Sequence, residues 1–208
     1  MKGLLLKDFY MVKKYCKTYL LFALVFNAVS LAGNENLFFA FYPCLLSGMI
    51  PVTLLGYDER SKWNEYCSTL PYTKAQIVSG KYLMGLFVQI FVLILSGITQ
   101  AVRMNISGGF VWNNYLMLMS ILLFISCIAA SINLPFMFKY GVEKGRIAYY
   151  LMIGFVCASS AAASGIYNVK LQTEVSFNGT LAILCIIGVV LYALSWWSSI
   201  EIYKKQEI

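Results

Sequence analysis

YLMGLFVQIFVLILSGITQA, at residues 82–101, is a stretch without a single Asp, Glu, Lys or Arg. A transmembrane helix needs about twenty consecutive, mainly apolar residues to cross the hydrocarbon core of a bilayer. The stretch is therefore predicted to span a membrane. The whole chain has the same character, since 60% of its 208 residues are hydrophobic and only 12% are charged. A soluble domain has about twice that charged fraction.

Similar apolar runs lie on both sides of this stretch and predict an all-α integral membrane protein. We expect one transmembrane domain over residues 1–208, with six spans at residues 15–32, 37–56, 82–101, 115–138, 147–167 and 180–198. The second span contains Pro43 and Pro51, and each proline removes a backbone donor and can bend a helix.

Residues 1–14 precede the first span and have a helical pattern of their own. Leu4, Leu5, Phe9 and Val12 recur at spacings of one to four residues along this segment, with charged residues between them. The pattern predicts an amphipathic helix that lies in the headgroup region of the membrane. A cytoplasmic extension of the first span is the alternative.

The basic residues fall mainly on one side of the predicted membrane. Fourteen of the sixteen Lys and Arg residues lie in residues 1–17, in the expected loops at 57–81 and 139–146, and in the C-terminal tail. Arg103 and Lys170 lie in the other loops. Because cytoplasmic loops carry the excess of Lys and Arg, both termini are predicted to be cytoplasmic. The net charge of +7 is therefore expected to face anionic lipid, and no nucleic-acid partner is expected.

Several kinds of chemistry are missing from the sequence. It has no His, and Gly80-Lys81 lacks the upstream glycine and the following Ser or Thr of a phosphate-binding P-loop. We therefore expect a chain that is not an enzyme and holds no metal or cofactor. The spans carry only neutral polar groups, among which Asn27, Gln89 and Asn133 are candidates to line a transport pathway. Hydrogen bonding between helices is the alternative role for each of the three.

The longest polar stretch, residues 57–81, reads YDERSKWNEYCSTLPYTKAQIVSGK. Asp58 is predicted to cap a short helix running through Trp63 to Tyr66. Thr73 and Gln76 form a T-x-x-Q capping box that should begin the helix of the third span. Between the two helices, Leu70-Pro71 predicts a break, because the residue before a proline avoids helical angles.

The short helix has the features of a docking site. Trp63 and Tyr66 are three residues apart, so they should share one helix face. Aromatic residues and Arg dominate the energetics of protein interfaces. Anchoring of the two rings in lipid is the alternative, but it does not explain acidic residues beside an anionic leaflet. The predicted contact residues are Asp58, Glu59, Arg60, Trp63, Glu65 and Tyr66.

In these motifs the chain resembles the half-size, six-span branch of the ABC type-2 exporter permeases. The resemblance lies in the opening MKGLLLKD and in an ordered series after the second span: an acidic pair, an aromatic residue, Leu-Pro, and Val-x-x-Lys-Tyr at Val78 to Tyr82. Within that branch the chain is most similar to permeases that export phenol-soluble modulins or antimicrobial peptides.

The resemblance implies more than composition does. Residues 1–14 would be an elbow helix on the inner leaflet, and residues 58–66 a coupling helix in a groove of a separate ABC ATPase. Two identical copies of the permease and two ATPases would form the working unit, with ATP and magnesium bound by the ATPase. The cargo would be an amphipathic peptide, exported across a plasma membrane of bacterial type.

A second class of function stays open at this point. The protein could be a membrane immunity or sensor protein that binds a toxic peptide without exporting it. A stand-alone channel is disfavoured, because no ring of charges or filter signature is visible.

Overall fold

The computed structural model describes residues 2–31, 38–106, 108, 110–145, 147, 150, 151, 154 and 177–205. The regular elements among these residues are all helices, with no strand, which confirms the all-α prediction for this part of the chain. The helices are α1 (Lys2–Tyr15), α2 (Lys17–Leu31), α3 (Phe38–Arg60), α4 (Trp63–Ser68), α5 (Lys74–Ile106), α6 (Trp112–Tyr140) and α8 (Phe177–Lys205).

Four of these helices, α3, α5, α6 and α8, are long and apolar enough to cross a membrane, and α2 is apolar but shorter. The expected fifth span, residues 147–167, falls mostly outside the described residues. Six spans with two cytoplasmic termini therefore remain a prediction.

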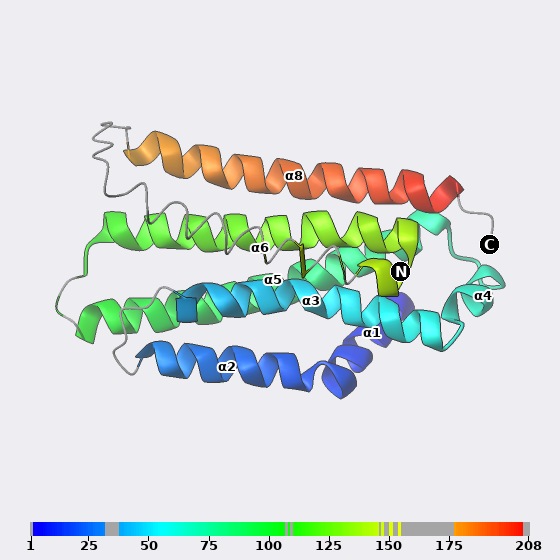
Figure 1. The fold of residues 1–208 in the computed structure, drawn as a ribbon, viewed down its shortest axis with the longest axis horizontal. Helices are drawn as coiled ribbons and strands as arrows, with labels where there is room; N and C mark the ends of the chain where they lie inside the picture. The colour runs from blue at the N-terminus through cyan, green and yellow to red at the C-terminus, as the bar shows by residue number, and fades with distance from the viewer. Residues whose placement is uncertain are drawn as a thin grey trace.

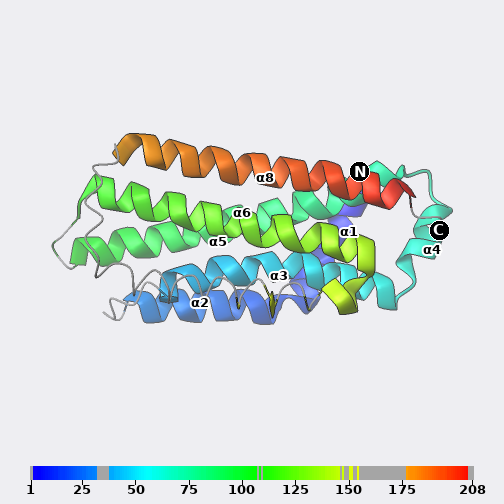
Figure 2. The ribbon, with the colours of Figure 1, turned by 45° about the horizontal axis from the view of Figure 1, so that its top comes forward.

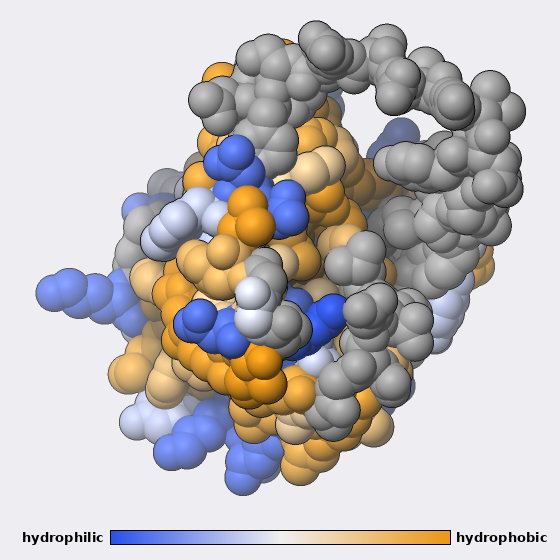
Figure 3. Space-filling model, turned by 90° about the vertical axis from the view of Figure 1, so that its left-hand side faces the viewer, coloured by the Kyte–Doolittle hydropathy of each residue, from blue (hydrophilic) through white to orange (hydrophobic). Residues whose placement is uncertain are grey.

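The long helices run roughly along one direction, as the two ribbon views show (Figures 1 and 2). The start of α1, the end of α8 and the short helix α4 lie at the same end of the bundle, which we call the α4 end. The turn between α5 and α6 lies at the opposite end. Viewed from there, hydrophobic side chains dominate the described surface, with hydrophilic residues in scattered groups (Figure 3).

α5 is the central helix, since it contacts α1, α2, α3, α6 and α8. It approaches α3 closely at Gly85, where an added Cβ atom would lie 3.0 Å from the Cγ atom of Pro51. α3 approaches α6 in the same way, with Gly48 against Ala129. Small residues at such crossings let helix backbones pack tightly in a bilayer, where lipid is as apolar as the side chains. α3 is helical through both of its prolines.

Hydrogen bonds join α5 to α8 near the α4 end. The Tyr82 hydroxyl lies 2.7 Å from the hydroxyl oxygens of both Ser195 and Ser199. The Tyr192 hydroxyl donates to the backbone carbonyl of Tyr82 at 2.8 Å, and the Trp196 ring stacks on the Tyr82 ring with centroids 5.6 Å apart. These contacts give the interface between α5 and α8 both close packing and satisfied polar groups.

Four of the helices extend past the ends of the expected spans. α3 continues from residue 56 to Arg60, and α5 begins at Lys74 rather than at residue 82. α6 runs from Trp112 to Tyr140 rather than over residues 115–138, and α8 continues from residue 198 to Lys205. The connection expected over residues 57–81 is thus mainly helical, with α4 between the two long helices. The helices are longer than the expected spans because hydropathy detects only the apolar part of a helix. The backbone hydrogen bonds of the helix continue beyond that part, into the interfacial region.

Candidate functional site

Four charged residues meet inside the α4 end of the bundle and form what we call the ion-pair cluster: Lys7 and Asp8 of α1, Asp58 of α3 and Lys81 of α5. Lys81 Nζ lies 2.6 Å from Asp8 Oδ1 and 2.5 Å from Asp58 Oδ2. Lys7 Nζ lies 2.7 Å from Asp58 Oδ1 and 3.4 Å from Asp8 Oδ1. Each lysine therefore contacts both carboxylates.

The cluster is buried and electrically balanced. The side chains of Asp8, Lys81 and Asp58 are 0%, 1% and 4% exposed, and that of Lys7 is 22% exposed. Buried charges are tolerated when they are paired with opposite charges and hydrogen bonded. Asp8 Oδ2 is buried without a hydrogen-bond partner. The cluster ties α1, α3 and α5 together. Loss of any one member would leave a buried charge without its full set of partners.

The helical spacing of α1 explains how Asp8 reaches the interior. Leu4, Asp8 and Val12 are the buried residues of this helix, at a spacing of four. The expected apolar face therefore has a carboxylate at its centre, and Phe9, expected on that face, is 57% exposed.

α4 sits directly beside the cluster. It begins after Lys62, which has a left-handed backbone (φ 53°) and makes no side-chain cap. Trp63 and Tyr66 share a face, as predicted, with ring centroids 5.5 Å apart. The Trp63 ring lies under Lys7, whose Nζ is 4.0 Å from the ring centroid. Tyr66 is 59% exposed. One ring thus contacts the cluster, while the other is accessible to a partner.

The structure corrects one expectation, for Asp58, and adds a contact for Glu59. Asp58 does not cap α4, because it lies inside α3 and its carboxylate is held by two lysines. Glu59 accepts a hydrogen bond from the backbone N–H of Val142 at 3.1 Å and so links α3 to the segment after α6. Their roles at a partner interface remain predictions. The exposed residues around α4 include Glu59, Arg60, Lys62, Glu65 and Tyr66.

The beginning of α5 forms as predicted. The backbone N–H of Gln76 donates to Thr73 Oγ1 at 3.3 Å, and the backbone N–H of Thr73 donates to Gln76 Oε1 at 3.2 Å. This reciprocal pair is a capping box. Leu70 and Pro71 lie between α4 and α5, where the sequence predicted a break.

The three candidate pathway residues are buried within the protomer. Asn27 Oδ1 accepts from Thr99 Oγ1 at 2.9 Å, and Gln89 Nε2 donates to the carbonyl of Ser126 at 3.0 Å. Both bonds join two helices, which is the alternative role considered for them. Asn133 Nδ2 donates within α6 to Ala129, and its Oδ1 is buried without a partner. Lining of a pathway by these residues remains a prediction.

Sequence reasoning missed the ion-pair cluster, because it assigned Lys7 and Lys81 to membrane-flanking basic segments. One signal was available: Asp8 lies at the same helical register as Leu4 and Val12. The other members of the cluster, Asp58 on α3 and Lys81 on α5, lie far away in the sequence and could not be found from spacing. Among the described residues, no group of His, Cys, Asp and Glu could hold a metal ion.

Comparison with known proteins gives one match. The family model described as "ABC-2 family transporter protein" matches residues 3–204. No curated protein and no solved structure matches the chain.

Proposed function

Because the chain belongs to the ABC-2 family of transporter proteins, it is a multi-pass permease subunit of an ABC transporter, and we propose that it exports amphipathic or antimicrobial peptides, or other amphiphilic cargo. The family implies a partner ABC ATPase and a non-catalytic role for this chain. Peptide cargo, outward direction and a bacterial plasma membrane are parts of the proposal.

The observation that carries the proposed coupling mechanism is the position of α4 beside the ion-pair cluster. α4 presents Tyr66, 59% exposed, together with the exposed charges of Arg60 and Glu65. Aromatic residues and Arg are enriched at the centres of protein interfaces. We assign this face to contact with the ATPase and the α4 end to the cytoplasm, in agreement with the distribution of Lys and Arg.

The cluster would transmit movement from α4 into the membrane. Trp63 touches Lys7, and Lys7 is paired with Asp58 on α3, while Lys81 connects Asp58 to α5. When ATP and magnesium close two ATPase subunits, α4 would move with them and tilt the ends of α3 and α5. Two permeases would enclose the pathway between them.

The cargo assignment follows from the chemistry of the spans. Between Lys81 and Arg103, α5 carries no charge, and its polar residues include Gln89 and Gln100, whose amides are engaged in hydrogen bonds to other helices. A site for a transported ion would need charged side chains or arrays of carbonyl groups. An apolar wall with a few neutral amides suits an amphipathic helix better.

Docking is tested by Tyr66→Ala and Glu65→Lys in the permease co-expressed with its ATPase. We expect both variants to recover less ATPase on permease purification and to lose cargo-stimulated ATP hydrolysis. Trp112→Ala is the matched control, because Trp112 is an aromatic residue, 66% exposed, at the start of α6 and therefore at the opposite end of the bundle. Full ATPase recovery by both α4 variants would remove α4 from the coupling mechanism.

Cargo is tested separately with the reconstituted complex. An amphipathic helical peptide should stimulate ATP hydrolysis and accumulate in the lumen of inverted vesicles, whereas a scrambled peptide of equal composition should do neither. Binding of the peptide without ATP-dependent movement would favour the immunity or sensor function instead.

A further inference from the structure

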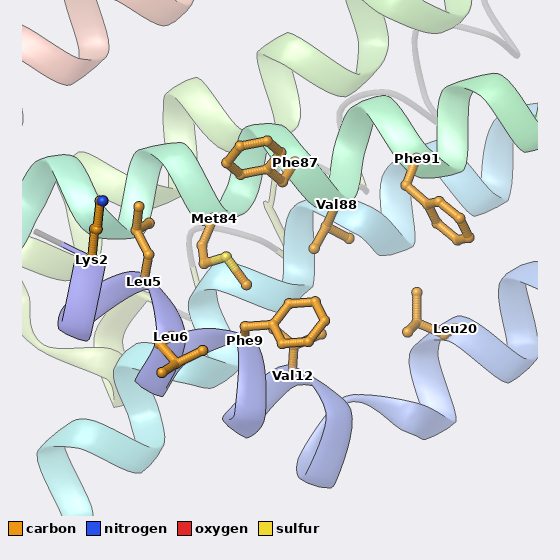
Figure 4. Close-up of a pocket in the computed structure, with 10 residues that line it drawn as sticks. All are labelled: Lys2, Leu5, Leu6, Phe9, Val12, Leu20, Met84, Phe87, Val88 and Phe91. Carbon is orange, nitrogen blue, oxygen red and sulfur yellow. The ribbon is translucent and has the colours of Figure 1, made fainter.

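An apolar groove of about 650 Å³ runs between α1, α2 and α5 (Figure 4). Its size falls within the range of small-molecule sites. The lining residues are apolar except for one lysine: Lys2, Leu5, Leu6, Phe9, Val12, Leu20, Met84, Phe87, Val88 and Phe91. The groove lies outside the ion-pair cluster, and the proposed transport function does not use it.

The bend between α1 and α2 creates the groove. The two helices meet at Cys16, and both pack against α5 from one side. Val12, Met84 and Val88 are buried and belong to one packed cluster, which forms the floor. The rim is exposed, with Phe9 at 57% and Phe91 at 60%.

The rim has the composition of a lipid-facing surface rather than of a helix interface. Helix interfaces in membranes favour Gly, Ala, Ser and Thr, which permit close backbone approach. The small residue Gly85 of α5 faces α3 instead, against Pro51. On the groove side α5 presents Phe87 and Phe91, which are too bulky for close approach of a second copy's backbone. Water is an unsuitable occupant too, since a bound water needs two to four polar partners.

The charge at the groove indicates which lipid it would select. Lys2 lines the groove at its α4 end, beyond Leu5 in the close-up view (Figure 4). It makes no ion pair within the described part of the chain, unlike Lys7 and Lys81, which are held in the cluster. A lysine ammonium offers three donors and binds phosphate as a point charge.

We propose that the groove binds one acyl chain of an anionic phospholipid, from the leaflet at the α4 end, and that Lys2 pairs with its phosphate. The chain would lie along α5 from Met84 to Phe91, a rise of about 10 Å. The bound lipid fills the wedge under the α1–α2 bend and holds α1 at its present angle to α5.

The test uses the full-length protein purified in mild detergent and measures co-purified lipid by native mass spectrometry. Phosphatidylglycerol and phosphatidylcholine of identical acyl chains are added separately. We expect one phosphatidylglycerol per protomer to be retained in preference to phosphatidylcholine, and Lys2→Gln to lower that preference by about fivefold. Lys13→Gln is the matched control, because Lys13 is exposed on the same helix and does not line the groove.

Two substitutions fill the groove and should reduce retention of both lipids. Val88→Phe fills the buried floor, and Leu6→Trp starts from a position 56% exposed, where a larger side chain leaves the packed core intact. Equal retention of the two lipids by the unaltered protein would overturn the proposal, as would undiminished retention in Leu6→Trp. Disulfide-linked dimers of Phe9→Cys would also overturn it, because a second copy would then occupy the groove. None of these measurements depends on transport.

Discussion

Lys81 on α5 reaches Asp8 on α1 with an Nζ–Oδ1 distance of 2.6 Å, although 73 positions separate them in the sequence. Both side chains are buried. A purely interfacial helix would hold its charges in the headgroup region. α1 instead inserts a carboxylate into the bundle, so its position is coupled to α3 and α5 through charge as well as through apolar contacts.

Replacing Asp8 with Asn should destabilise the protein by about 3–5 kcal/mol, because it leaves the buried Lys81 ammonium with one carboxylate fewer. The measurement is the thermal unfolding midpoint of the purified permease. Glu65→Gln is the control, since it removes a charge from the exposed Lys62–Glu65 pair at 3.8 Å. Such surface pairs contribute about 0–1 kcal/mol.

Removing both charges together distinguishes pairing from a simple packing effect. The double variant Asp8→Asn, Lys81→Gln leaves Lys7 and Asp58 as one balanced pair, so it should recover part of the midpoint that each single change loses. A double variant no more stable than the worse single variant would show that the ion pair itself contributes little.

How much of this end of the molecule the sequence predicts depends on the range of each interaction. The capping box of Thr73 and Gln76 joins residues three apart, so local spacing was enough to predict it. Asp58 was assigned to a cap by the same local reasoning, and that was wrong, because two lysines from other helices compete for its carboxylate. Local patterns carry no information about such distant partners.

The same limit explains why the pairing of Lys81, just before the third span, was not predicted. Lys81 directly precedes the uncharged stretch, so sequence alone places it at the end of the polar loop over residues 57–81. The structure places it inside α5 with its side chain 1% exposed. Two lysines and two aspartates that neutralise one another do not register in hydropathy, which scores each residue alone.

Removing the hydroxyl group of Tyr82 should weaken the α5–α8 interface. Tyr82→Phe retains stacking on Trp196 but loses the contacts with Ser195 and Ser199. Hydrogen bonds between membrane helices contribute about 0.6 kcal/mol on average, so we expect a loss of about 1 kcal/mol for the two. Denaturant titration measures the change. Tyr10→Phe, at a site 62% exposed, should have no effect, and equal losses in both would contradict the prediction.

Enlarging Gly85 should separate α5 from α3. A Cβ atom there lies 3.0 Å from the Pro51 ring, which cannot rotate away, so Gly85→Val should cost about 1–3 kcal/mol of stability. Gly188→Ala is the control, since its Cβ atom would lie 3.5 Å from its nearest neighbour, an ordinary contact. Expression level and detergent unfolding report the difference, and a Gly85→Val protein as stable as the unaltered one would show that the crossing can relax.

The thiol of Cys67 should react slowly with maleimide. Cys67 is fully buried in α4, and burial raises the pKa of its thiol above the ordinary value. Lys7 lowers this pKa by a smaller amount, and Asp58 raises it. Because the thiolate is the reactive form, a raised pKa leaves less of it at any given pH. Increasing the pH through the ordinary thiol range, about 8 to 9, should therefore accelerate an exposed thiol well before it accelerates Cys67.

Peptide mapping after pulse labelling makes this comparison within one protein. Thr69→Cys supplies an exposed thiol two residues from Cys67, and its labelling should rise with pH while that of Cys67 lags behind. If α4 docks onto an ATPase, binding should protect Thr69→Cys and leave the already slow rate at Cys67 unchanged. Labelling of Cys67 as fast as that of Thr69→Cys in the free permease would mean that α4 does not pack on the bundle as described.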